Sequence, residues 1–114
     1  MTRAIIDEDG RVVCESCEVA GTPLARMRGL LGRKSVAAGE GLLLPRAWSV
    51  HTFFLAFPID VVFLDRGLHV RAVVSGVRPF RLVVRPGFGS VLELAAGEAE
   101  RVGLRPGSSL AWRD

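Results

Sequence analysis

Residues 50–65 read VHTFFLAFPIDVVFLD and hold the densest apolar run of the chain. The run encloses His51, Thr52 and Asp60, which need hydrogen-bond partners if they are buried. Pro58 interrupts it, and the segment that follows has no polar alternation, which predicts a strand buried on both faces. The rest of the chain is therefore expected to cover this strand and to supply partners for its polar groups.

Length and composition predict one globular domain over residues 1–114. The chain is 49% hydrophobic and 24% charged, which is typical of a folded protein that buries a core without disulfides or metal. A membrane span needs about 20 consecutive apolar residues, and Pro58 and Asp60 break the longest candidate. The N-terminal segment MTRAIID is too short and too soon acidic for a signal peptide. We therefore expect a cytoplasmic protein without a membrane span.

The formal charge of +3 comes almost wholly from arginine, because Lys34 is the only lysine. Nucleic-acid binding is typically marked by a clustered basic stripe with aromatic stacking residues. The arginines here are scattered along the chain, and no RNA-binding signature or basic helix accompanies them. The pattern argues against a nucleic-acid partner.

The first 19 residues predict a hairpin whose turn lies at Gly10. Its second arm carries Cys14 and Cys17, a C-x-x-C pair. On a regular strand, residues three apart project to opposite faces, so we expect these thiols neither to share a metal nor to form a disulfide. We interpret them as structural cysteines and predict no metal and no cofactor. A zinc or thiol site is the alternative, although His51 and His69 do not obviously complete a zinc ligand set.

A Thr-Pro pair followed by apolar residues at helical spacing predicts a helix over residues 22–31. Arg28 lies at the margin of its apolar face. A guanidinium at the edge of a core needs a carboxylate, and Asp60 and Glu93 are the leading candidates. The alternative is that Arg28 extends over the apolar face to water.

The other segments are short and mostly strand-like. Residues 68–75 alternate apolar and polar positions, which indicates a strand with one buried face and places His69 on its exposed side. Further short apolar runs occupy residues 42–44, 51–55, 60–64, 82–84, 91–94 and 109–112, and a short surface helix is expected over 95–102. These elements predict a mainly β fold, a compact antiparallel β-sandwich or barrel-like domain with two short helices. An α+β arrangement is the alternative.

An ordered set of short motifs resembles the bacterial and archaeal domain-of-unknown-function family numbered 192. The motifs are RGLLGR at residues 28–33, GLLL at 41–44, HTFF at 51–54, PIDVVFLD at 58–65 and VLELAAG at 91–97. The resemblance covers residues 19–110 and implies a β-rich fold with short helices and no established activity. Three positions depart from the family pattern: Leu42 replaces a methionine, His51 a tryptophan, and Ser108 an aspartate.

Two functions are consistent with these residues. The preferred hypothesis is a non-catalytic domain that binds a small polar ligand or a partner protein through a polar cluster, whose members are Arg28, Arg33, His51, Thr52, Asp60 and Glu93. The alternative is a small hydrolase or sugar-modifying enzyme with Asp60 or Glu93 as the acid-base group and His51 as its partner. The chain contains neither a G-x-S-x-G motif nor a phosphate-binding loop with its lysine. The pattern does not determine the oligomeric state.

Overall fold

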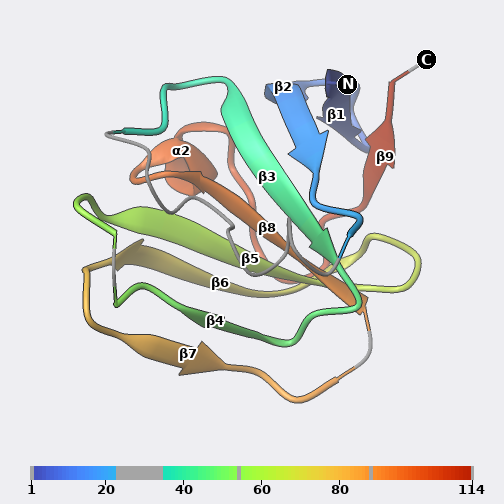
Figure 1. The fold of residues 1–114 in the computed structure, drawn as a ribbon. Coiled ribbons are helices and arrows are strands. Elements are labelled where there is room, and N and C mark those ends of the chain that lie inside the picture. Colours follow the sequence, from blue (N-terminus) through green and yellow to red (C-terminus); the bar gives the residue numbers. More distant parts are fainter. Residues whose placement is uncertain (1, 23–34, 54, 88, 114) are drawn as a thin grey trace.

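The computed structural model describes residues 2–22, 35–53, 55–87 and 89–113 (Figure 1). Seven strands form one sheet in the order β6-β5-β8-β3-β2-β1-β9, and β4 and β7 form a second, two-stranded sheet. In chain order the elements are β1 (Thr2–Asp7), β2 (Val12–Val19), β3 (Glu40–Pro45), β4 (Ser49–His51), β5 (Ile59–Asp65), β6 (Val70–Val77), β7 (Leu82–Val84), β8 (Gly89–Ala95), α2 (Glu98–Arg101) and β9 (Leu110–Trp112). The mainly β prediction is confirmed.

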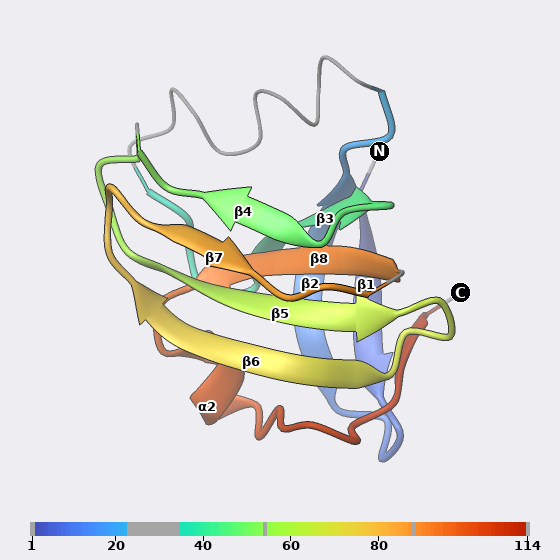
Figure 2. The same cartoon turned by 90° about the horizontal axis from the view of Figure 1, so that it is seen from below.

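The large sheet is built around β8, which pairs antiparallel with β3 on one side and β5 on the other. The β2–β3 pair is parallel, and the remaining pairs of the sheet are antiparallel. The β4–β7 sheet covers one face of the large sheet, whereas α2 lies against the other (Figure 2). The chain thus forms two apolar layers, one on each side of the large sheet.

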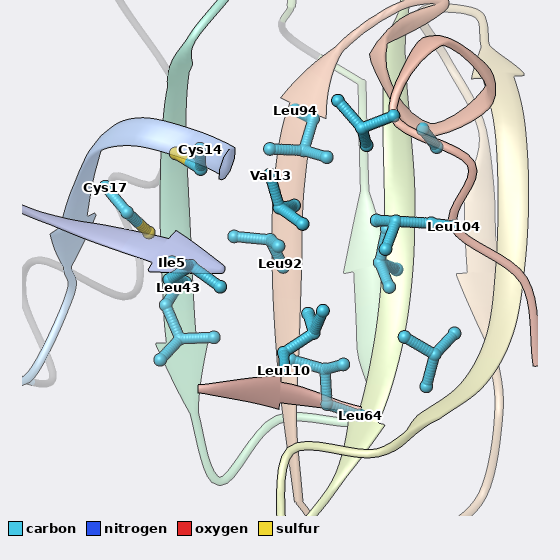
Figure 3. Close-up of a cluster of buried hydrophobic side chains, with 14 residues drawn as sticks. Ile5, Val13, Cys14, Cys17, Leu43, Leu64, Leu92, Leu94, Leu104 and Leu110 are labelled. Atoms are coloured by element: carbon cyan, nitrogen blue, oxygen red, sulfur yellow. The ribbon is translucent and has the colours of Figure 1, made fainter. Parts of the chain in front are cut away.

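Strand β5 confirms the prediction made for the central run, since its first six positions are all buried. Val62 and Leu64 point into the cluster on the α2 side, which Figure 3 shows. Val61 and Phe63 point into the second cluster, which includes Val50 of β4 and other residues beneath the small sheet. Side chains that alternate between two dry faces leave no position for solvated polar groups, which explains the uninterrupted apolar pattern.

Within the described residues, the helix predicted over residues 95–102 is shorter than expected. Helix α2 spans four residues rather than residues 95–102, because β8 continues to Ala95, which pairs with Ile59 of β5. The helix predicted over residues 22–31 lies almost wholly outside the described residues. Within the part of the chain that the structure describes, no helix has the length and apolar character needed to cross a membrane.

The expectation that Cys14 and Cys17 point to opposite faces is wrong. Arg3 is opposite Cys17 and Ile5 is opposite Cys14, so two steps along β1 match three steps along β2. The extra residue on β2 is a β-bulge, and it reverses the alternation of the side chains that follow it. Both cysteines are therefore buried in the same apolar cluster, on the α2 side of the sheet (Figure 3).

Candidate functional site

Asp60 of β5 is fully buried, and both of its carboxylate oxygens accept hydrogen bonds from the backbone. Oδ1 accepts from Gly76 N at 2.8 Å, and Oδ2 accepts from Gly97 N at 3.0 Å and Ala99 N at 2.9 Å. A bulge in β6 at this point removes Gly76 N–H from the strand ladder. The prediction of a buried, partnered Asp60 is thus fulfilled by backbone donors, which join β6 to the start of α2.

Glu93 of β8 lies on the other face of the sheet. It is paired with Val61 and Leu42, whereas Asp60 is paired with Leu94. Since successive strand residues alternate between faces, the carboxylates of Asp60 and Glu93 point away from each other. Glu93 is 4% exposed, and its Oε1 has no hydrogen-bond partner among the described residues. Burial raises the pKa of Glu93 to about 7.

His51 is the last residue of β4, and Thr52 begins the loop that follows it. Thr52 is fully buried; its hydroxyl donates to Arg78 O and accepts from Arg81 N at 3.0 Å. His51 is exposed, and its ring stacks on Phe53 with 5.6 Å between the ring centroids. The Thr52 hydroxyl therefore secures the loop between β6 and β7, while the His51 ring faces solvent.

These four residues of the predicted polar cluster do not meet in one cleft. Asp60 and Glu93 are separated by the sheet, the Thr52 hydroxyl is used by a loop, and His51 lies on the outer surface. Arg28 and Arg33 lie outside the described residues, so their part in the cluster stays a prediction.

A different group of residues, rich in arginine, lines adjoining hollows at one end of the large sheet. We call it the arginine corner; its members are Arg46, Trp48, Arg66, Arg71, Arg85, Gly87 and Gly89. The β5–β6 turn, the β3–β4 link and the β7–β8 link meet at this end (Figures 1 and 2). A cavity of about 80 Å³ is lined by Trp48, Arg71 and Arg85 among others. An adjoining hollow of about 230 Å³ is lined by Arg46, Trp48, Arg66 and both glycines.

Backbone contacts hold the links of the corner together. Ala47 N donates to Gly89 O at 3.2 Å, and Arg85 N donates to Trp48 O at 3.0 Å. Gly89 also packs directly on β5, because a Cβ at this position would lie 1.9 Å from Leu64 O. Glycine is therefore required at position 89 for strands β8 and β5 to approach each other this closely.

The charge balance of the corner is positive. The carboxylate that lines it, Asp65, already accepts from Gly67 N at 2.9 Å, His69 N at 2.9 Å and His69 Nδ1 at 3.2 Å. These hydrogen bonds lower the pKa of Asp65. Arg85 donates from Nη1 to Val84 O at 2.8 Å, which fixes part of its guanidinium. Four arginines thus surround hollows whose lining carboxylate is engaged by its own turn.

The sequence pattern gave little indication of this corner. Its arginines are far apart in the chain and were interpreted as scattered charges. They meet because β5 ends, and β6 and β8 begin, at the same end of the large sheet. The segment PGFG at residues 86–89, together with an exposed Trp48, was the available signal.

Comparison with known proteins identifies the family of this chain. The sequence profile of the domain-of-unknown-function 192 family, described as an uncharacterized ACR, matches residues 4–112. The chain belongs to this family. A UPF0127 protein of Thermococcus sibiricus is 29% identical to it over 108 residues, which cover 90% of this chain and 70% of that protein.

Two crystal structures share the fold of this family member. A candidate transcription regulator from Sinorhizobium meliloti has a TM-score of 0.84 and 26% identity, with 96% of this chain and 90% of that chain covered. A protein of unknown function from Novosphingobium aromaticivorans has a TM-score of 0.83 and 22% identity, with 98% and 84% covered. The family resemblance suggested by the motifs is confirmed.

Proposed function

We propose that this member of the domain-of-unknown-function 192 family is a non-catalytic binding domain, which takes a small anion bearing a planar ring at the arginine corner. The observation that carries the proposal is the convergence of Arg71, Arg85 and the exposed Trp48 on one cavity. Asp65 is the one acidic side chain in the lining of that cavity. Two guanidinium groups against one carboxylate leave a net positive charge for a ligand.

The chemistry of the corner suits an anion. Guanidinium groups present paired donors that match the oxygens of a carboxylate or phosphate. A cavity needs roughly 10–15 Å³ to hold one water, so the one of about 80 Å³ has room for an anionic group. Trp48 is 52% exposed and lines both this cavity and the larger hollow, so its indole offers a face for a planar ring.

Glu93 favours the second candidate, an enzyme that uses acid-base chemistry. A carboxyl whose pKa is about 7 is well placed to exchange a proton at neutral pH. The hollows of the arginine corner, however, are lined by other residues and do not reach Glu93. We therefore rank anion binding first, and a turnover that Glu93→Gln abolishes without loss of fold would reverse the order.

The binding test uses Trp48 as its own reporter. The chain has two tryptophans, so Trp112→Phe leaves Trp48 as the single fluorophore. Inorganic phosphate, benzoate and a nucleoside monophosphate are titrated at low ionic strength. We expect the two ring-bearing anions to bind more tightly than phosphate and to change Trp48 emission, and added salt to weaken all three.

Charge-matched variants separate the corner from the general basicity of the chain. Arg71→Gln and Arg85→Gln should each weaken binding by about tenfold, which corresponds to about 1.4 kcal/mol. Arg105→Gln removes the same charge from the turn before β9 and should leave binding unchanged. Equal losses in all three variants, or no saturable binding of any anion, would refute the proposal.

Duplex DNA is included as a competitor because the Sinorhizobium meliloti structure is described as a candidate transcription regulator. We expect it not to displace the mononucleotide. Displacement by DNA at lower concentration than the mononucleotide, with a steep salt dependence, would replace the small-anion proposal with nucleic-acid binding.

A further inference from the structure

The β4–β7 sheet and the links that flank it carry most of the exposed apolar side chains of the described residues. The large apolar residues exposed there are Trp48, Phe53, Phe80 and Leu82, whereas Val19 is exposed at the end of β2. The two strands form an outer layer over the large sheet (Figure 2). Exposed apolar side chains that gather in one region mark an interaction surface.

Three of these side chains lie at the end of the small sheet where β4 stops and β7 begins. Leu82 is opposite His51, and both face outward because the next pair along the two strands is buried. The His51 ring stacks on Phe53, and Phe80 N donates to Thr52 O at 3.0 Å. We call this end the apolar tip; its members are Phe53, Arg78, Phe80, Arg81 and Leu82.

The backbone presents the Phe80 ring to solvent. Phe80 has a φ of 64°, in the left-handed region that residues other than glycine rarely adopt, and its side chain is 68% exposed. Burial of the ring therefore does not hold this conformation. The buried Thr52 holds it, since its hydroxyl accepts from Arg81 N at 3.0 Å and donates to Arg78 O. Backbone strain of this kind is typical of functional sites.

The charge around the apolar tip is positive. Residues 41–59 and 66–92, which include both strands and their links, contain no aspartate or glutamate. Arg78 and Arg81 are exposed on either side of Phe80, and Arg81 Nη1 donates to Phe80 O at 3.3 Å. A second copy of the same surface would be repelled, so the charge complements an anionic partner.

We propose that the apolar tip docks this domain on the surface of an anionic lipid bilayer. Phe80 and Leu82 are 68% and 62% exposed, so they protrude, whereas a peptide is typically bound in a groove or pocket. The hollows of the arginine corner have other lining residues. Protruding apolar side chains can enter the boundary between headgroups and acyl chains while arginines beside them meet the lipid phosphates. Such docking is peripheral and needs no spanning helix.

The test is co-sedimentation with two kinds of vesicle, phosphatidylcholine alone and phosphatidylcholine mixed equally with phosphatidylglycerol. We expect binding to the mixed vesicles, binding at least about tenfold weaker to phosphatidylcholine alone, and a loss of binding as salt is added. Entry of the tip is measured with Phe80→Trp in a chain whose own two tryptophans are replaced by phenylalanine. Its emission should shift to shorter wavelength on the mixed vesicles.

Apolar variants test the contribution of the protruding side chains. Phe80→Ser and Leu82→Ser should each lower the partition coefficient on mixed vesicles about tenfold, whereas Phe80→Leu should retain it. Val19→Ser removes an exposed apolar side chain from the large sheet and should have no effect. The proposal is independent of the arginine corner, so Phe80→Ser should bind benzoate as the unaltered chain does.

Charge variants test the contribution of the arginines. Arg78→Gln and Arg81→Gln should each lower the partition coefficient about fivefold, whereas Arg105→Gln should leave it unchanged. Urea midpoints close to that of the unaltered chain show that these variants are folded, and the Phe80→Trp emission does not depend on them.

Absence of binding to mixed vesicles at low ionic strength, an unshifted Phe80→Trp emission, or equal losses in the Val19 and Arg105 controls would overturn the proposal. A dimer that Phe80→Ser dissociates would also overturn it. A single-stranded oligonucleotide that binds more tightly than the vesicles, and loses that binding in Phe80→Ser, would assign the apolar tip to nucleic acid instead.

Discussion

Replacement of Asp60 by alanine is expected to be the most damaging single change to a polar residue of the described fold. The substitution removes the acceptor of the backbone N–H groups of Gly76, Gly97 and Ala99. Ala99 is buried, so its N–H is orphaned at a cost of about 1–3 kcal/mol, whereas Gly76 and Gly97 are exposed and water replaces part of what their N–H groups lose. We expect about 2–4 kcal/mol of lost unfolding free energy, because the two partly buried hydrogen bonds add to the one buried orphaned donor.

The assay is equilibrium urea unfolding at neutral pH, with fitted midpoint and slope. Asp60→Asn keeps one acceptor oxygen for Gly97 and Ala99 but turns an amide N–H₂ toward Gly76, so it should lose roughly half as much as alanine. Ser90→Ala is the matched control, because its hydroxyl is buried in the same sheet with no partner in the described structure. A loss below about 0.5 kcal/mol for Asp60→Ala would refute the view that this carboxylate joins β6 to α2.

Three further changes test other parts of the structure. Burial raises the pKa of Glu93 from 4.5 to about 7, so between these pH values the folded chain keeps a proton that the unfolded chain releases. The free energy of unfolding should therefore fall by about 3 kcal/mol as the pH rises from 4.5 to about 7. Urea melts of Glu93→Gln should not show this fall. Gly89→Ala should cost at least about 3 kcal/mol because its Cβ meets Leu64 O, whereas Gly21→Ala, which meets nothing within 4 Å, should be neutral in thermal melts. Arg101→Ala removes the exposed partner of an i,i+3 ion pair whose carboxylate, on Glu98, is buried. Because Glu98 keeps its hydrogen bond from Gly39 N, urea melts should show a loss below about 1 kcal/mol, and a larger loss would show that this pair supports α2.

Apolar periodicity was sufficient to predict the main sheet. The run that became β5 lacks polar alternation because both of its faces are dry, and the alternation after the turn at Gly67 marks β6 with one wetter face. His69 is exposed, as its position in that alternation indicated. Such a pattern depends only on which face of the strand meets water, and the order of apolar and polar residues along that strand is sufficient to show it.

Features that depend on register or on long-range pairing were not predictable in the same way. The bulge that brings Cys14 and Cys17 together is set by the pairing of β2 with β1, and no residue type in β2 requires it. The partners of Asp60 are backbone groups, which carry no side-chain signature in the sequence. The arginine corner forms because connecting segments that are far apart in the sequence meet at one end of the large sheet.

The position of β8 has a consequence for how the chain folds as it is synthesised. This strand lies between β3 and β5 in the sheet, yet it follows both in sequence. Until residue 95 has left the ribosome, β3 and β5 lack the neighbour that joins them, and each presents an open edge. The two parts of the sheet therefore combine late, and stalled or shortened chains that end before β8 should be captured by holdase chaperones, whereas chains that include it should escape.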